Sequence, residues 1–282
     1  MAQEKEMSFL EHLEELRWHF IKALIVVIAL TIVSFVYIKE IFDLLVFAPA
    51  KADFITFKWM CQLGEFAGIK DSLCVTELPF KVQSRNMTGQ FMMSLTASFV
   101  IGLIASFPYV VWEFWSFIRP GLETKERKFS KGAVFAISVL FLSGVLFGYY
   151  FLVPMTVWFL ATYSISDMIV NEFDITSYVS TVTSLVMGCG LLFQFPVVIY
   201  FLSKIGMVTP ELMRKYRKHS VVVILVLGAV ITPSADPFSL TLISLPLYLL
   251  FEISIFTSAY VVRKKRKEDA KEEAKEKAEK GS

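Results

Sequence analysis

A short acidic stretch before the first apolar segment carries a carboxylate that lacks a local counter-ion. Residues 8–19 begin with Ser and Glu at the spacing of a capping box, and apolar side chains follow at helical intervals, so the sequence predicts a helix here. Side chains three or four residues apart meet on a helix, and Arg17 can therefore neutralise Glu14. Glu15 has only an indole and an imidazole at those spacings. We interpret Glu15 as an unpaired acid beside an apolar segment, with an ordinary solvated carboxylate as the alternative.

A second carboxylate repeats this pattern further along the chain. Pro120 and Gly121 break the helix in the connection between two later apolar segments. If the chain turns helical again after Leu122, Glu126 has no basic residue three or four positions ahead of it. Glu15 and Glu126, each near Trp and Phe side chains, would suit a ligand with two cations and an apolar part. Arginine suits them best, because its guanidinium donates two parallel hydrogen bonds to one carboxylate.

The composition is that of a membrane protein with several spans. Of the 282 residues, 55% are hydrophobic and 27 are Phe, against roughly 45–50% apolar residues in soluble domains. The net charge of +2, with basic residues in short blocks beside apolar runs, argues against nucleic-acid binding. The acidic start has no basic region and no cleavage site, which predicts that the first apolar segment is retained and favours a bacterial or organelle-encoded chain.

Six apolar segments reach or approach the roughly 20 residues that a membrane-spanning helix needs. They are residues 20–38, 90–112, 132–153, 179–203, 218–233 and 238–261. Basic residues concentrate in the connections on one side, which predicts that both termini are cytoplasmic. The predicted fold class is all-α, a single six-helix transmembrane domain over residues 1–262, curved by prolines and followed by a charged cytoplasmic tail, 263–282. The fifth segment is short, so it either thins the bilayer and binds other helices or has a misplaced boundary.

The long connection 39–89 is predicted to lie on the side opposite the termini. Its apolar side chains are numerous enough to lie on the membrane or to cap the bundle, and we expect short helices or strands there. Cys61 and Cys74 in this connection could form a disulfide in an oxidising compartment or remain free thiols. Cys189 lies inside an apolar segment and is expected to be a small packing residue.

Several motifs, in order along the chain, resemble the TatC family. They are HLEELR at residues 12–17, FIRPGL at residues 117–122 followed by Glu126-Arg127, Phe195-Pro196, and the turn from Thr232-Pro233 to Phe238-Ser239. Each motif alone is weakly specific, but together they cover residues 8–262. The resemblance implies the multispanning receptor subunit of the twin-arginine protein translocase, located in the bacterial plasma (inner) membrane.

The resemblance also implies a function and a set of binding residues. Such a subunit is expected to bind the twin-arginine signal peptides of folded proteins and to export these proteins with single-span TatA/TatB-type subunits, driven by the proton-motive force. It is expected to work in membrane lipid as a homo-oligomer within a larger complex, without a cofactor. Glu15 and Glu126 match the two carboxylates that receive the arginine pair. The other residues expected at the signal-peptide site are Leu16, Arg17, Pro120, Gly121 and Leu122.

The chain departs from the family pattern at a few polar positions. His19 stands where the family has a basic residue, which would make the surroundings of Glu15 sensitive to pH. Gln194 stands where some relatives have Glu, and an amide can form hydrogen bonds but does not titrate. Leu240 replaces a polar amide in the last turn, which otherwise stays polar. The polar residues expected to contact a partner helix there are Thr232, Asp236 and Ser239.

A different class of function rests on polar groups inside the apolar segments. A charge such as Glu252 costs about 2.5–3.5 kcal/mol on insertion scales, so Glu252 should contact a partner, or be protonated or hydrogen-bonded within the chain. A small-solute or ion secondary transporter using Gln194 and Glu252 is the alternative function, although no internal half-repeat is detectable. An enzyme is disfavoured because the three His lack metal-ligand spacing and no nucleophile motif is present. We therefore predict no catalytic residue and no metal site.

Overall fold

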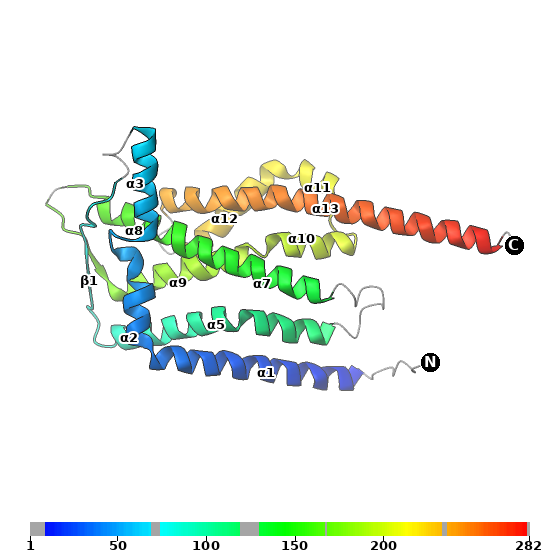
Figure 1. Ribbon diagram of the computed structural model, residues 1–282, viewed down its shortest axis with the longest axis horizontal. Coiled ribbons are helices and arrows are strands. Elements are labelled where there is room, and N and C mark those ends of the chain that lie inside the picture. The colour runs from blue at the N-terminus through cyan, green and yellow to red at the C-terminus, as the bar shows by residue number, and fades with distance from the viewer. Residues whose placement is uncertain (1–8, 69–73, 119–129, 167, 233–235, 281–282) are drawn as a thin grey trace.

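Long helices lie side by side along the long axis of the molecule (Figure 1). The computed structural model describes residues 9–68, 74–118, 130–166, 168–232 and 236–280. In these ranges, five stretches are long and apolar enough to cross a membrane: Leu13–Val36, Gly89–Ile118, Gly132–Thr162, Ile175–Lys204 and Pro237–Lys267. Helices suit this composition, because a helix satisfies its own backbone hydrogen bonds where no water is present.

The elements alternate between long helices and short connecting pieces. The first half contains α1 (Phe9–Val36), α2 (Ile38–Ile41), the helical turns η1 (Phe42–Val46) and η2 (Ala48–Ala50), α3 (Ile55–Ala67), strand β1 (Lys81–Gln83) and α5 (Gly89–Ile118). The second half contains α7 (Ser130–Phe147), η4 (Gly148–Leu152), α8 (Val153–Thr162), strand β2 (Glu172–Asp174), α9 (Ile175–Leu192), α10 (Phe195–Lys204), α11 (Pro210–Lys215), α12 (Arg217–Ile231) and α13 (Pro237–Lys280).

The two ends of the bundle carry different structures. At one end, α1 begins, α5 ends, α7 begins and α13 ends, and we call it the terminal end (Figure 1). The opposite end, which we call the cap end, carries α2, α3 and a small parallel sheet in which Lys81 of β1 lies opposite Glu172 of β2. The connection 39–89 therefore contains short helices and a strand, as the sequence predicted.

The fifth predicted span, residues 218–233, corresponds to a helix shorter than a bilayer. α12 has 15 residues, and 15 residues at 1.5 Å each cover about 22 Å, against a hydrocarbon core of about 30 Å. Within the described ranges, α12 is therefore too short to count among the five stretches of spanning length. α12 instead packs along α13 and also touches α9 and α11.

The last span and the charged tail form one helix. α13 runs from Pro237 to Lys280, through the predicted boundary at residue 262. Prolines mark irregular points in two of the other spans: Pro154 stands at the start of α8, directly after the π-helical turn η4, and Pro196 at the start of α10, after a turn at Phe193 and Gln194. Proline lacks an amide hydrogen, so it is best tolerated in the first turn of a helix, where that donor has no partner within the helix. Pro108 and Pro246 lie inside continuous helices.

The polypeptide between α1 and β1 is fixed to the bundle by side-chain hydrogen bonds, and a disulfide links two of its own residues. The hydroxyl of Tyr149 donates to the carbonyl of Leu45 at 3.0 Å, and that of Tyr178 to the carbonyl of Val46 at 2.8 Å. Cys61 of α3 is disulfide-bonded to Cys74, with 4.3 Å between their Cα atoms. Cys189 is a buried free thiol in the apolar cluster that joins α10, α12 and α13.

Asp174 caps the first turn of α9. Its carboxylate accepts hydrogen bonds from the hydroxyl and the amide of Thr176, at 2.5 and 2.8 Å, and from the amide of Arg85 at 3.0 Å. The side-chain bond from Thr176 contributes most, followed by the two backbone bonds, and together they hold the pKa of Asp174 below its ordinary value. The cap also joins α9 to the residues that follow β1.

We expect the start of α9 to lose protection in acid. A carboxylate whose pKa is lower in the folded than in the unfolded protein stabilises the fold fully above the unfolded pKa, and this stabilisation is lost as the pH falls through the folded pKa. The loss should therefore begin below about pH 4, near the ordinary pKa of Asp. Hydrogen exchange of the first turn of α9 measures it. Asp174→Asn keeps an acceptor but does not titrate, so equal pH dependence in both proteins would contradict the assignment.

Glycine allows α1 and α5 to approach closely. A Cβ atom on Gly102 of α5 would lie 2.5 Å from Oγ1 and 2.7 Å from N of Thr31 in α1. A backbone nitrogen cannot move aside without displacing its helix, so only glycine fits at this crossing.

Gly102→Ala should therefore destabilise the bundle. Overpacking of this kind costs about 1–3 kcal/mol, because the two helices must separate. Thermal unfolding in detergent, followed by circular dichroism, should show a lower Tm. Gly132→Ala is the matched control, since nothing lies within 4 Å of a Cβ at Gly132 in α7. Equal Tm values for the two variants would mean that the α1–α5 contact tolerates a methyl group.

Candidate functional site

Glu15 has a buried carboxylate oxygen that lacks a hydrogen-bond donor. The residue is half-buried in the second turn of α1, and its Oε2 has no partner among the residues that the structure describes. An unsatisfied buried acceptor costs about 1–3 kcal/mol, and more when it is charged. Such a group is satisfied only when a hydrogen-bond donor reaches it.

The neighbouring cation on α1, Arg17, contacts residues other than Glu15. Arg17 lies 3.7 Å from Glu14, and their side chains are 63% and 66% exposed. The guanidinium of Arg17 also lies 5.7 Å from the centre of the Trp18 ring. The predicted pairing of Arg17 with Glu14 is thus present, and it leaves Glu15 without this cation. Leu16, which stands between Glu15 and Arg17 in the sequence, is half-buried.

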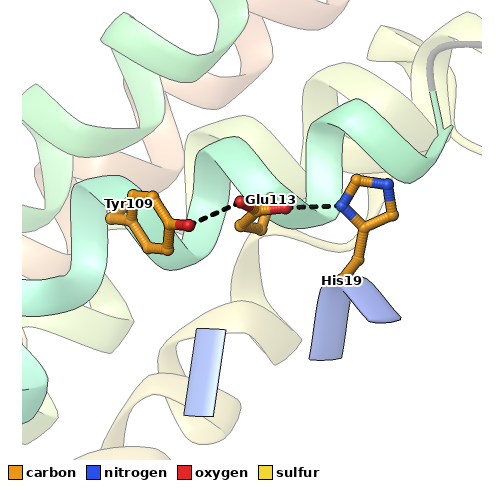
Figure 2. Close-up of polar contacts among 3 residues, drawn as sticks. All are labelled: His19, Tyr109 and Glu113. Atoms are coloured by element: carbon orange, nitrogen blue, oxygen red, sulfur yellow. Dashed lines mark hydrogen bonds and ion pairs between the residues drawn. The ribbon is translucent and has the colours of Figure 1, made fainter. Parts of the chain in front are cut away.

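His19 lies one turn after Glu15 and contacts α5 through a buried acid. Nδ1 of His19 is 2.5 Å from Oε2 of Glu113, and the hydroxyl of Tyr109 donates to Oε1 of Glu113 at 2.7 Å. Figure 2 shows the Glu113 carboxylate between the two rings. Glu113 is only 5% exposed, yet both of its oxygens are bonded. His19 is therefore engaged with Glu113 and not with Glu15.

The sequence analysis did not include Glu113 or Tyr109 among the site residues. The predicted second span ended at residue 112, which put Glu113 just outside it, whereas α5 continues to Ile118. A usable signal existed, because Tyr109 and Glu113 are four residues apart and share one helix face. No such spacing connects Glu113 to His19, because His19 lies on a different helix.

The predicted second acidic site falls outside the described residues. Glu126, Pro120, Gly121 and Leu122 all lie in 119–129, for which the structure gives no placement. The helices that flank this range, α5 and α7, end and begin at the terminal end, where α1 also begins (Figure 1). Glu15 and the flanks of the Glu126 segment therefore occupy the same end of the bundle.

Aromatic rings surround this end of α1 and α5. The ring of Phe117 lies 6.4 Å from that of His19, and Trp115 lies 5.6 Å from Phe201 of α10. Trp18 and Trp112 are 52% and 53% exposed. Amphipathic indole rings are enriched at the level of lipid headgroups, so these two exposed rings fit a membrane interface.

Two intramembrane polar residues singled out from the sequence have partners within the chain. Arg217 donates to Oε2 of Glu252 at 2.7 Å, with side chains 46% and 23% exposed. Nε2 of Gln194 donates to the carbonyl of Ile137 at 3.3 Å, while its Oε1 is buried without a partner among the described residues. Of the two alternatives for Glu252, the internal hydrogen bond is the one present in the structure.

The polar residues of the last turn are also used internally. The hydroxyl of Thr232 donates to the carbonyl of Gly228 at 2.9 Å. That of Ser239 lies 3.1 Å from the hydroxyl of Thr156 in α8, and the amide of Ser239 donates to Asp236 at 2.7 Å. Thr232 and Ser239 are 3% and 1% exposed, so in this structure their side chains do not reach the surface.

Five apolar helices of spanning length, in the ranges that the structure describes, define a multi-pass membrane protein. Residues 11–246 match the family described as Sec-independent protein translocase protein (TatC). The TatC protein of Blattabacterium sp. subsp. Periplaneta americana is 40% identical over 94% of this chain and 100% of its own length. That of Koribacter versatilis is 33% identical, over 94% of this chain and 89% of its own.

A solved structure agrees with these relatives. The crystal structure described as that of the twin arginine translocase receptor TatC matches with a TM-score of 0.68 and 27% identity, over 89% of this chain and 99% of its own. The chain belongs to the TatC family, which confirms the resemblance of its motifs. This family is one of protein transport by a translocase.

Removing the Glu113 carboxylate should weaken the contact between α1 and α5. Removal of this buried carboxylate leaves the donors that contact it unsatisfied, which costs about 1–3 kcal/mol for each. Loss of a single hydrogen bond, as in Tyr109→Phe, costs about 1 kcal/mol. Denaturant unfolding of Glu113→Ala in micelles measures the effect, and Glu14→Ala is the control, because its ion pair is exposed.

A double-mutant cycle isolates the pair itself. His19→Ala combined with Glu113→Ala should cost less than the sum of the two single changes, because each single change leaves the other group unpaired. Additive losses would show that the two side chains do not interact in the folded protein.

Proposed function

We propose that this protein is the receptor and core subunit of a twin-arginine translocation system. It binds the twin-arginine signal peptides of folded proteins and exports those proteins with single-span TatA/TatB-type subunits, driven by the proton-motive force. Membership of the TatC family and the description of the solved relative as a receptor support this proposal.

The observation that carries the proposal is the unpartnered oxygen of Glu15. Its carboxylate is half-buried at an aromatic end of the bundle, and Arg17 and His19, the next basic residues along α1, contact Glu14 and Glu113 instead. A guanidinium from a peptide supplies the missing donors, and two parallel hydrogen bonds from it would satisfy the carboxylate. The site therefore has room for a cation that the described residues do not provide.

The second arginine is assigned to Glu126. This residue follows α5 and precedes α7, whose adjoining ends lie at the same end of the bundle as the start of α1. In the proposed site, Leu16, Arg17, Pro120, Gly121 and Leu122 shape the surface around the two carboxylates. The exposed rings of Trp18 and Trp112 offer contacts for the apolar part of the peptide.

The proposal includes a topology that goes beyond the five long helices. α12 serves as a sixth, short span in a locally thinned bilayer, and single-span partners bind where it packs on α13. Asp236 is the polar residue of that turn closest to such a partner, since Thr232 and Ser239 are buried. Residues 1–262 form one domain in the bacterial inner membrane, with both termini cytoplasmic and with several copies in one complex.

The carrier hypothesis receives no support from the polar groups on which it depended. Glu252 is paired with Arg217, and a neutralised carboxylate offers no free charge to a transported ion. We therefore do not propose solute transport.

Glu15→Gln should abolish capture of a twin-arginine peptide. An amide keeps the shape of the side chain but removes the negative charge that pairs with the guanidinium. If this weakens the free energy of binding by about 1.4 kcal/mol or more, the affinity falls at least about tenfold. Photocrosslinking of a labelled signal peptide to membranes containing the full-length variants measures capture. Glu126→Gln should lose the crosslink as well.

Glu14→Gln is the matched control, because Glu14 lies next to Glu15 but is 66% exposed and paired with Arg17. It should crosslink like the wild type. A peptide in which both arginines are replaced by lysine should crosslink poorly, since lysine cannot form the bidentate bond. Equal crosslinking in all three variants and with both peptides would refute the receptor site.

A further inference from the structure

The helix α3 lies crosswise to the spanning helices at the cap end. In Figure 1 its axis is roughly perpendicular to α5, α7 and α13, and it lies level with their ends along the long axis of the bundle. A helix in this position runs parallel to the membrane plane at the depth where the spans leave the hydrocarbon. Nothing in its proposed family role assigns a function to this surface.

One face of α3 packs against the bundle. Phe57 and Thr56 are 1% and 5% exposed, and the hydroxyl of Thr56 donates to the carbonyl of Tyr150 in η4. Phe54, which precedes the helix, stacks on the ring of Tyr150 at 5.8 Å and meets that of Tyr149 edge-on at 5.7 Å. These contacts fix how α3 is rotated about its own axis.

A second face is apolar and exposed. Residues spaced three or four positions apart lie along one stripe of a helix. On α3, one such stripe carries four large apolar side chains. They are Ile55, Trp59, Leu63 and Phe66, which are 41%, 57%, 65% and 94% exposed. We call these four residues the α3 stripe. The α3 stripe does not serve to pack α3 against the bundle, because the residues that pack there lie on another face.

A third face is polar. Lys58, Gln62 and Glu65 are exposed and follow one another at helical spacing on the other side of the stripe. α3 therefore has an inner face on the bundle, an apolar face and a polar face, in that order around its axis. This arrangement is the pattern of a helix that lies at the boundary between lipid and water.

We propose that α3 is an interfacial membrane anchor whose stripe inserts into the lipid leaflet at the cap end. Three observations favour lipid as the occupant: the crosswise orientation, the depth level with the span ends, and a tryptophan in the stripe beside a polar face. The disulfide between Cys61 and Cys74 holds the second half of α3 to the chain before β1, so the stripe is presented without rearrangement.

Trp59 provides a built-in probe for the experiment. The full-length protein is placed in phosphatidylcholine vesicles whose acyl chains carry bromine either near the headgroup or near the chain end. The difference in fluorescence between wild type and Trp59→Phe isolates the signal of Trp59 from the four other tryptophans, since the chain has five. Shallow bromine should quench it more strongly than deep bromine, because interfacial helices insert by about 5–10 Å.

Two paired variants test the stripe itself. Leu63→Ser with Phe66→Ser should shift Trp59 emission to longer wavelength and remove most of its quenching. Lys58→Ser with Gln62→Ser, on the polar face of the same helix, should leave both unchanged. A cooperative thermal transition with the Tm of the wild type, followed by circular dichroism, shows that each variant has folded.

Two results would overturn the proposal. Emission from Trp59 at the wavelength of exposed indole, without quenching by either lipid, would mean that the stripe faces water. Emission at short wavelength without quenching would mean that protein covers the stripe, either a second copy or another subunit.

Discussion

A carboxylate inside an apolar bundle needs a donor, and this constraint governs where the acidic groups of this protein lie. Glu113 is enclosed by His19 and Tyr109, and Glu252 is paired with Arg217. Glu15 differs from both, because its buried oxygen has no donor among the described residues. Two of these acids therefore stabilise contacts between helices, whereas the third lacks a donor in the part of the chain that the structure describes.

The spans were predictable because their apolar content is a property of single segments. Five of the six predicted segments coincide with helices of spanning length, and the short fifth one was already unusual in the sequence. Helix ends were less predictable, since an amphipathic start or a charged tail continues a helix without changing its geometry. Thus α1 includes the acidic stretch before its span, and α13 includes most of the tail after residue 262.

Contacts between distant segments could not be predicted from periodicity. His19 and Glu113 are 94 residues apart, and nothing in either segment identifies the other as its partner. The same holds for the connection 39–89, whose apolar residues could have capped the bundle or contacted the membrane. The structure divides them by the rotation of α3: Phe57 packs inward, and Phe66 on another face is exposed. The hydrogen bond from Thr56 to the carbonyl of Tyr150 in η4 helps to determine that rotation, and the sequence gives no sign of it.

The orientation of α1 follows from restraints at both of its ends. Near the terminal end, His19 joins it to α5, and closer to the cap end, Gly102 lets the two helices meet at Thr31. At the cap end, the chain beyond α1 is held through the carbonyl of Val46, which accepts the hydroxyl of Tyr178. A helix restrained at three levels cannot rotate freely, so the half-buried orientation of Glu15 is set by the bundle itself. For the peptide binding that we propose, such preorganisation would raise affinity, because less conformational entropy would be lost.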